Sequence, residues 1–329
     1  FEKNHYVGNF FNHNIVSMKI FSCPARYPIK YFRKKYKLNL EPLFPLNKII
    51  MKSSSKSTTI DGSVFGHVFK SGSQSYSIEN QIKSNVKAPI FFDTLVNFKD
   101  IQHEYDVIVA ATGDGCIAKE LGIWNIGTQI QVRSATVVSK FETGFVKMWL
   151  NTDYSKNCYC YLVPNSEKEA SLIMALNNSS FSELDYYWKE FLLKEEVNYP
   201  ITETRDSEYS TGYPDFLQIG NIYFTGNSAG TIDDLLGFGA FRAIESGILL
   251  ARAIIKDLDY SKLLKPLLED VKHLHEFRKL LDTFDNNDYD RLVAFLGLPG
   301  IKQFIYKNPF FSVKHYAFAV KLLNRIKSS

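Results

Sequence analysis

One stretch of the chain, residues 221–253 (NIYFTGNSAGTIDDLLGFGAFRAIESGILLARA), constrains the possible folds more than any other. A short apolar strand at Ile222–Phe224 leads through small residues into a helix that begins at Gly237-Phe238-Gly239. Glycine lets a ligand approach the backbone closely, and a helix start presents unpaired N–H groups and partial positive charge. The pattern therefore predicts a strand–turn–helix unit that suits an electron-rich, phosphate-bearing ligand. An ordinary strand–loop–helix unit with a tight helix contact is the alternative.

A second strand is predicted within residues 105–113 (YDVIVAATG). The run Val107–Ala111 is continuously apolar, which is typical of a strand buried on both faces, and it ends in Thr112-Gly113, at the edge where open α/β sheets bind ligands. Residues 113–118 (GDGCIA) also satisfy a Gly-x-Gly-x-x-Ala dinucleotide-binding turn. That alternative requires an acidic residue about 20 positions later. Because residues 130–140 contain none, we favour the first interpretation.

Aromatic residues dominate a third region. Between residues 130 and 151 apolar and polar side chains alternate, which predicts antiparallel strands. Tyr159, Tyr161 and Val163 then share one face of a strand that ends at Pro164, and another strand is expected at 170–176. A half-buried hairpin with an apolar core face is the plain alternative to a ligand-lining surface.

Together these motifs resemble the FAD-binding motifs of the p-hydroxybenzoate hydroxylase-like flavoproteins, especially their geranylgeranyl reductase branch. That family has Gly-Asp-Ala-Ala-Gly after a strand and then a Gly-x-Gly turn into a long helix; Asn227 stands here where Asp is usual. The resemblance implies that Asn227 contacts the ribitol chain of FAD and that the start of the helix faces the isoalloxazine ring. The implied FAD contacts are Ala111, Thr112, Gly113, Gly226, Asn227, Gly230, Gly237, Phe238 and Gly239.

The same resemblance implies a substrate site. Residues 159–164 (YCYLVP) are similar to the Tyr-x-Trp-x-Phe-Pro pattern of geranylgeranyl reductases, with Tyr161 in place of Trp and Val163 in place of Phe. Tyr159, Tyr161, Val163 and Pro164 would then line a cavity for a prenyl chain. The implied activity is reduction of C=C bonds in an isoprenoid or other apolar substrate by flavin hydride transfer, with NAD(P)H or ferredoxin as the candidate electron donor. The alternatives are a flavin monooxygenase or halogenase of the same fold, and a non-catalytic lipid-binding or scaffold protein on a decayed flavoprotein fold.

The first residues of the chain add to this resemblance. In the family, an acidic residue follows the second strand and binds the adenosine ribose; Glu2 is the matching residue here. The first strand and its Gly-x-Gly-x-x-Gly turn would precede this point. We therefore expect an N-terminally incomplete sequence that lacks about one βα unit. The alternative is a chain that never bound a dinucleotide.

The predicted fold class is α/β. A Rossmann-like FAD-binding sheet, N-terminally incomplete, would carry an inserted antiparallel β-sheet substrate domain and a helical C-terminal region. We assign residues 1–60, 77–128 and 215–260 to the FAD-binding domain, 61–76 and 129–214 to the substrate domain, and 261–329 to the helical region. Within these, short strand pieces are expected at 90–92 and 95–96, and a capped helix at 182–197.

Composition excludes several classes of protein. The 39 basic and 35 acidic side chains leave a net charge of +4, which is too small to indicate a nucleic-acid partner. No metal site is expected, since Cys158 and Cys160 lack metal-type spacing and no HExxH motif occurs. With four cysteines and no apolar run of about 18 residues, we expect a cytoplasmic protein of undetermined oligomeric state. The basic, aromatic segment 309–329 is a candidate for peripheral membrane contact, although packing against the body is the simpler expectation.

Overall fold

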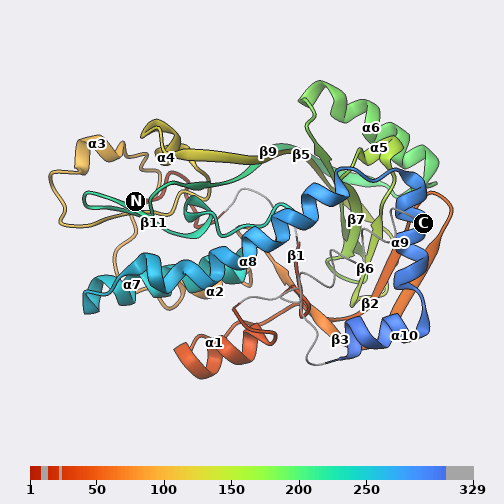
Figure 1. Ribbon diagram of the computed structural model, residues 1–329, viewed down its shortest axis with the longest axis horizontal. Helices are drawn as coiled ribbons and strands as arrows, with labels where there is room; N and C mark the ends of the chain where they lie inside the picture. The colour runs from red at the N-terminus through yellow and green to blue at the C-terminus, as the bar shows by residue number, and fades with distance from the viewer. Residues whose placement is uncertain (9–13, 22–23, 309–329) are drawn as a thin grey trace.

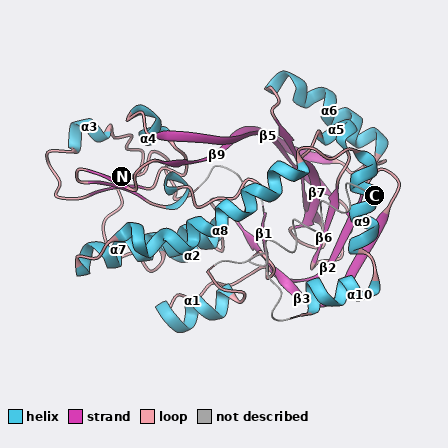
Figure 2. Ribbon diagram, in the orientation of Figure 1, coloured by secondary structure: helices cyan, strands magenta, loops and turns pink. Residues whose placement is uncertain are grey.

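The computed structural model describes residues 1–8, 14–21 and 24–308, which form two sheets and the helices around them (Figures 1 and 2). The larger sheet has eight strands in the order β1-β3-β2-β6-β7-β8-β5-β9, and the smaller has three in the order β10-β11-β4. In Figure 1 the long strands β5 and β9 run from the small sheet, at the left, to the large sheet, at the right. The strands are β1 (Asn14–Met18), β2 (Phe44–Lys52), β3 (Ser57–Lys70), β4 (Ile108–Ala110), β5 (Trp124–Val138), β6 (Phe145–Trp149), β7 (Tyr159–Pro164), β8 (Glu169–Asn177), β9 (Ile201–Pro214), β10 (Gln218–Ile219) and β11 (Ile222–Phe224).

The eight-stranded sheet is antiparallel except where β2 pairs with β6 in parallel. Its apolar side chains face two separate cores, because residues alternate between the two faces of a strand. One core lies under α6 and includes Trp149, Leu172 and Phe191; the other lies under α9 and includes Ile49 and Val293. The predicted antiparallel strands after residue 130 and the hairpin at 159–176 are confirmed.

The helices follow capping signals that are mostly local. Helix α6 (Phe181–Lys194) begins at Ser180, whose side chain and that of Glu183 form a capping box, so its cap lies before the predicted Ser182. Asp285 caps α9 and forms a capping box with Asp288. The other helices are α1 (Pro28–Tyr36), α2 (Ile78–Lys83), α3 (Phe98–Ile101), α4 (Cys116–Glu120), α5 (Thr152–Ser155), α7 (Ala240–Lys256), α8 (Tyr260–Leu281), α9 (Asn286–Leu296) and α10 (Pro299–Lys302), with a 3₁₀ turn η1 (Gly226–Ala229) and a π turn η2 (Gln303–Lys307).

The small sheet packs one face on α7 and α8. Ile108 and Phe224 contact a core that includes Leu250 and Leu264. On the other face, the side chains of Val107 and Val109 are 36% and 45% exposed. The prediction of a strand buried on both faces is therefore wrong, since the described residues cover only the side of β4 that faces α7 and α8.

Two further expectations meet the structure differently. The strand pieces predicted at 90–92 and 95–96 are wrong: these residues form a loop, and Leu95 is 85% exposed. The loop pairs irregularly with the start of the chain, since the Glu2 N–H donates to the Phe91 carbonyl and Thr94 N–H donates to the Glu2 carbonyl. The predicted membrane-contacting segment 309–329 lies outside the described residues. Within the described part of the chain, no helix has the length and apolar character that crossing a bilayer requires.

Candidate functional site

The candidate site lies at the edge of the small sheet where β4 and β11 both end. These strands are parallel, with Ile108 opposite Ile222 and Ala110 opposite Phe224, so their carboxyl ends meet at one edge. The Thr225 N–H donates to the Ala110 carbonyl at 3.1 Å. The hydroxyls of Thr112 and Ser228 are 2.9 Å apart. The structure therefore brings together the predicted segments 111–113 and 226–230.

The alternative role for Gly113, as part of a dinucleotide-binding turn, does not fit this topology. Such a turn joins two parallel strands of one sheet through a helix. Here β4 leads into the five-residue helix α4 and then into β5, which belongs to the other sheet. The parallel neighbour of β4 is β11, more than a hundred residues later in the chain.

Helix α7 fixes the turn that follows β11. The buried Ser246 hydroxyl accepts the Gly226 N–H at 2.8 Å and lies 3.0 Å from the Thr225 hydroxyl. Gly226 and Gly230 have φ of 62° and 78°, in the left-handed region that favours glycine. A Cβ on Gly230 would lie 2.8 Å from the Gly212 carbonyl oxygen, so this glycine is also required by close packing against β9.

The start of α7 is built differently. Gly239 is the N-cap, and no side chain of the described chain caps the helix. Gly237 has φ of 71°, and the nearest atom that a Cβ there would meet is the Tyr159 hydroxyl, at 4.0 Å. The Phe238 carbonyl accepts hydrogen bonds from Arg242 at 2.7 Å and from the Asp233 N–H at 3.1 Å. The first amides of α7 are thus presented beside two aromatic side chains, Tyr159 and Phe238.

A buried charge pair holds this turn in place. Arg242 and Asp233 are each almost fully buried and lie 3.1 Å apart, and Asp233 also accepts the Leu236 N–H at 2.9 Å. Burial raises the pKa of Asp233 above its usual value, and the neighbouring Arg242 guanidinium opposes that rise. Asp234, the next residue, lies 2.5 Å from His275 and accepts a hydrogen bond from Thr128 at 3.3 Å.

The predicted substrate residues divide into two groups. The Tyr159 hydroxyl donates to the Leu236 carbonyl at 2.8 Å, and the Tyr161 ring lies 6.0 Å from the Tyr159 ring in the same apolar cluster as Phe238. Burial raises the pKa of both phenols, so they stay neutral. Pro164 lies at the other end of β7, roughly 16 Å away along the strand. Its carbonyl accepts a bond from Asn14, and with Val163 it lies away from the start of α7.

Glu2 lies on an N-terminal segment that runs close to the end of β4. Its carboxylate accepts the Asn4 N–H at 3.0 Å. Burial acts to raise the pKa of Asp114, but hydrogen bonds from Cys116 and Thr112 and the nearby charge of Lys3 lower it overall. The segment carrying Glu2 is thus close to the turn after β4. A ribose-binding role for Glu2 stays a prediction.

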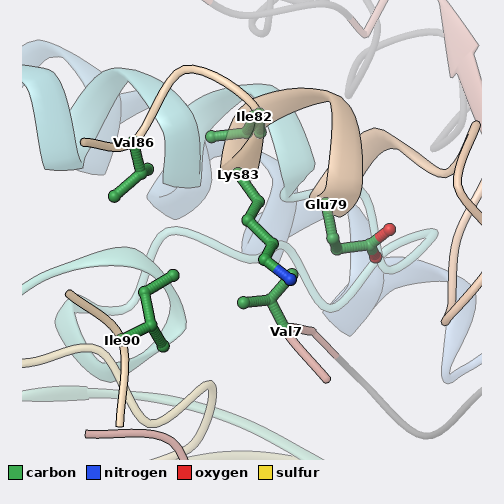
Figure 3. A pocket seen from close by; sticks show the side chains of 6 residues that line it. All are labelled: Val7, Glu79, Ile82, Lys83, Val86 and Ile90. Carbon is green, nitrogen blue, oxygen red and sulfur yellow. The ribbon is translucent and has the colours of Figure 1, made fainter. Parts of the chain in front are cut away.

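An open, apolar pocket of about 260 Å³ flanks the same N-terminal segment (Figure 3). Figure 3 shows Val86 and the side chains of α2 on one side and Val7 and Ile90 on the other. Its lining residues are Val7, Glu79, Ile82, Lys83, Val86 and Ile90. Ile90 directly precedes Phe91, which bonds to Glu2, so the pocket adjoins the predicted nucleotide end of the site.

Several buried polar atoms near the edge have no hydrogen-bond partner among the described residues. They include the Asn227 Oδ1 and Thr231 Oγ1 atoms of the turn after β11 and the Asp234 Oδ1 atom. Buried polar atoms are normally paired, because an unpaired one costs about 1–3 kcal/mol. Asn227 is the residue that the resemblance assigns to the ribitol chain of FAD, and its free oxygen fits a hydroxyl donor. No group of His, Cys, Asp or Glu in the described part of the chain is arranged to hold a metal ion.

Local sequence reasoning missed three contributors to this site: Ser246, the Asp233–Arg242 pair and the Asp234–His275 pair. The two aspartates stand in the first segment discussed, between its two glycine turns, and adjacent carboxylates in an otherwise apolar turn were the available signal. Ser246 and His275 carried no comparable signal, since each acts on a residue 20 to 41 positions away.

No protein-family model matches the chain. Solved structures do resemble it. A geranylgeranyl bacteriochlorophyll reductase-like protein from Thermoplasma acidophilum superposes with a TM-score of 0.71 at 12% identity, covering 99% of this chain and 91% of that one. A flavoprotein/dehydrogenase from Cytophaga hutchinsonii gives 0.62 at 12% identity, covering 99% and 92%. The p-nitrophenol 4-monooxygenase from Pseudomonas putida gives 0.56 at 10% identity, covering 79% and 80%.

These likenesses establish the fold. The chain has the fold of the flavoproteins that the sequence resembled, and the predicted α/β class, with its small Rossmann-like sheet and large antiparallel sheet, is confirmed. The predicted domain boundaries and the role of each site residue stay predictions.

Proposed function

We propose that the chain is an FAD-dependent oxidoreductase that acts on an apolar substrate, in the manner of a reductase of isoprenoid C=C bonds. One observation carries the proposal: Thr112, after β4, and Asn227, in the turn that leads toward α7, are more than a hundred residues apart in the sequence. They lie at one sheet edge, where the hydroxyls of Thr112 and Ser228 are 2.9 Å apart. The fold of flavoproteins supports the same cofactor.

The residues present fit FAD. Asn227 Oδ1 is buried and has no partner among the described residues, and Gly237 leaves room beside the backbone at the start of α7. The turn at Gly226–Gly230 and the end of β4 at 111–113 would hold the ribitol and phosphate portions, and Glu2 the ribose. When bound, the flavin supplies hydride from its N5 atom. The unpaired amides at Gly239 and after it favour negative charge near the helix start.

The side chains around the start of α7 support an apolar substrate. Phe21 and Phe238 lie 5.8 Å apart between ring centres, and both pack against the cluster that includes Tyr159 and Tyr161. Burial raises the pKa of both phenols and keeps them protonated, and in this proposal they orient the substrate and exclude water. The electron donor, NAD(P)H or ferredoxin, is part of the proposal.

A first experiment tests the cofactor. The full-length protein is incubated with FAD, separated from free flavin and examined for bound flavin absorbance. We expect a yellow protein, and about tenfold weaker binding in Asn227→Ala, since one hydrogen bond to a buried group is lost. Asn47→Ala, an exposed position on β2, is the matched control and should bind like the wild type. A colourless protein that FAD cannot reconstitute would support the non-catalytic scaffold alternative.

A flavin monooxygenase or halogenase is the second candidate, because the fold is also that of p-nitrophenol 4-monooxygenase. One experiment distinguishes the reductase from the monooxygenase activity. The reduced protein is mixed with prenyl or enoyl compounds without oxygen, and flavin reoxidation is followed by absorbance. A reductase regains the oxidised flavin spectrum without oxygen, whereas a monooxygenase consumes oxygen in proportion to substrate.

A further inference from the structure

The positive charge of this protein is concentrated in one segment. Residues 3–40 contain eight Lys and Arg side chains and no Asp or Glu. The rest of the chain therefore has 31 basic against 35 acidic side chains and is net negative, although the whole carries +4. The small net charge of the whole chain is therefore the sum of a strongly basic segment and a weakly acidic remainder. Such a local asymmetry of charge is typical of proteins that bind polyanionic surfaces.

Five of these eight cations lie on helix α1 and its C-cap. Lys30, Arg33 and Lys34 are spaced i, i+3 and i+4 and share one face of the helix. Lys37 is the C-cap, and its ammonium group donates to the Lys34 carbonyl; all four residues are exposed. Within the described residues, Lys30, Arg33 and Lys34 form no ion pair with a carboxylate. We call these four residues the basic stripe. Figure 1 shows α1 at the lower edge of the molecule, projecting from its body.

The opposite face of α1 is fixed to α7. The buried Phe32 ring stacks on Phe241 with ring centres 5.8 Å apart. The hydroxyls of Tyr31 and Tyr36 donate to the buried Glu245 carboxylate at 2.8 and 2.7 Å. Lys35, the one cation of the helix that turns inward, lies 3.3 Å from the same carboxylate. These contacts hold α1 against α7, so they fix the direction in which the basic stripe faces.

Helix α1 contacts the part of α7 that is nearest to the candidate site. Phe241 is the second residue of α7, and Gly239 is its N-cap. The basic stripe therefore lies on the helix that packs against the first two turns of α7.

We propose that the basic stripe docks this protein on an anionic lipid surface. The contact is electrostatic, because the apolar face of α1 is already buried in the core of the protein and cannot insert. Tyr27, which is 49% exposed and directly precedes the helix, supplies an aromatic side chain of the kind found at membrane interfaces. The assignment does not depend on the identity of the cofactor.

A nucleic acid is the competing polyanion, and the surface fits it less well. Single-stranded binders combine cations with exposed aromatic rings on which bases stack. The aromatic residues of α1 itself, Tyr31, Phe32 and Tyr36, point to Glu245 and the core. That leaves the single ring of Tyr27, before the helix, as the exposed aromatic side chain within residues 24–40. An oligonucleotide is nevertheless included in the test.

The test is co-sedimentation of the full-length protein with vesicles of two parts phosphatidylcholine to one part phosphatidylserine, and with vesicles of phosphatidylcholine alone. The variant K30Q/R33Q/K34Q removes three cations of the stripe. The control K262Q/K265Q/K279Q removes three exposed lysines of α8, each within 3.8 Å of a carboxylate on the same helix or at its N-cap. Both variants lose the same net charge, and melting curves check that both are folded.

We expect the wild type to bind only the vesicles with phosphatidylserine, and less strongly as salt rises through about 0.15 M. The stripe variant should bind about 100-fold more weakly, since each cation near the surface contributes about fivefold. The control should bind within about twofold of the wild type. Equal loss in both variants, equal binding to neutral vesicles, or no binding by the wild type would each overturn the proposal. Tighter binding of an RNA or DNA oligonucleotide, lost in the stripe variant, would overturn it in favour of nucleic acid.

Discussion

Gly230 and Gly237 have nearly the same φ, 78° and 71°, but different surroundings. At Gly230 the protein fills the space itself, since a Cβ would lie 2.8 Å from the Gly212 carbonyl oxygen and from the Tyr213 Cβ. At Gly237 the nearest atom is the Tyr159 hydroxyl at 4.0 Å. The first glycine is explained by the fold alone. The second leaves backbone accessible at the start of a helix, where unpaired N–H groups can donate hydrogen bonds to a ligand.

The largest effect we predict comes from the charge pair that holds the second turn. Arg242→Met leaves the buried Asp233 carboxylate without its partner and removes the bond to the Phe238 carbonyl. The free energy of unfolding should fall by about 4 kcal/mol. Urea denaturation followed by circular dichroism measures it. A loss below about 1 kcal/mol would show that the turn does not depend on this pair.

Gly230→Ala should cost about 3 kcal/mol, because the substitution adds the strain of a left-handed residue to a steric conflict with β9. Gly237→Ala carries the strain alone and should cost about 1 kcal/mol. Denaturation of the two variants side by side tests this difference directly. If both cost the same, the contrast between the filled and the open turn is wrong.

A smaller effect is expected at the contact between β7 and the turn that contains Gly237. Tyr159→Phe removes the hydrogen bond to the Leu236 carbonyl and should lower stability by about 1 kcal/mol. It should also speed amide hydrogen exchange at residues 236–238. Tyr161→Phe, on the same face of the strand, is the matched control and should change exchange there much less. Unchanged exchange in Tyr159→Phe would show that this bond does not order the turn.

The smallest predicted effect concerns the N-terminal cap of α6, which is not part of either glycine turn and serves as a reference for them. Hydrogen bonds, first from the Ser180 N–H and then from Lys156, lower the pKa of Glu183 from 4.5 to about 2. The stability that its ionised form contributes is therefore complete above pH 4.5 and is lost as the pH falls toward 2. Glu183→Gln should flatten the acid limb of a plot of melting temperature against pH and leave flavin binding unchanged. An unaltered acid limb would refute the role of this cap.

The sequence predicted the parts of the site whose signals are local. The strand Ile222–Phe224, the helix start at Gly239 and the strand Tyr159–Pro164 lie where apolar runs, glycines and a proline placed them. It failed at Val109 and at residues 90–96, because burial and strand pairing depend on which distant segments come alongside. Ser246 and His275 were missed for the same reason. For the basic stripe, the spacing of the cations is visible in the sequence. The direction in which they face follows only from the hydrogen bonds that Tyr31 and Tyr36 donate to Glu245.

The central claim is that the start of α7 contacts a flavin. The most direct measurement is a titration of FAD into the ¹⁵N-labelled protein, followed through the backbone amide resonances. Our account predicts that the largest shifts fall on residues 237–241 and on Asn227, with little change at residues 212–214 on the filled side of Gly230. Saturable binding that leaves residues 237–241 unmoved would contradict it.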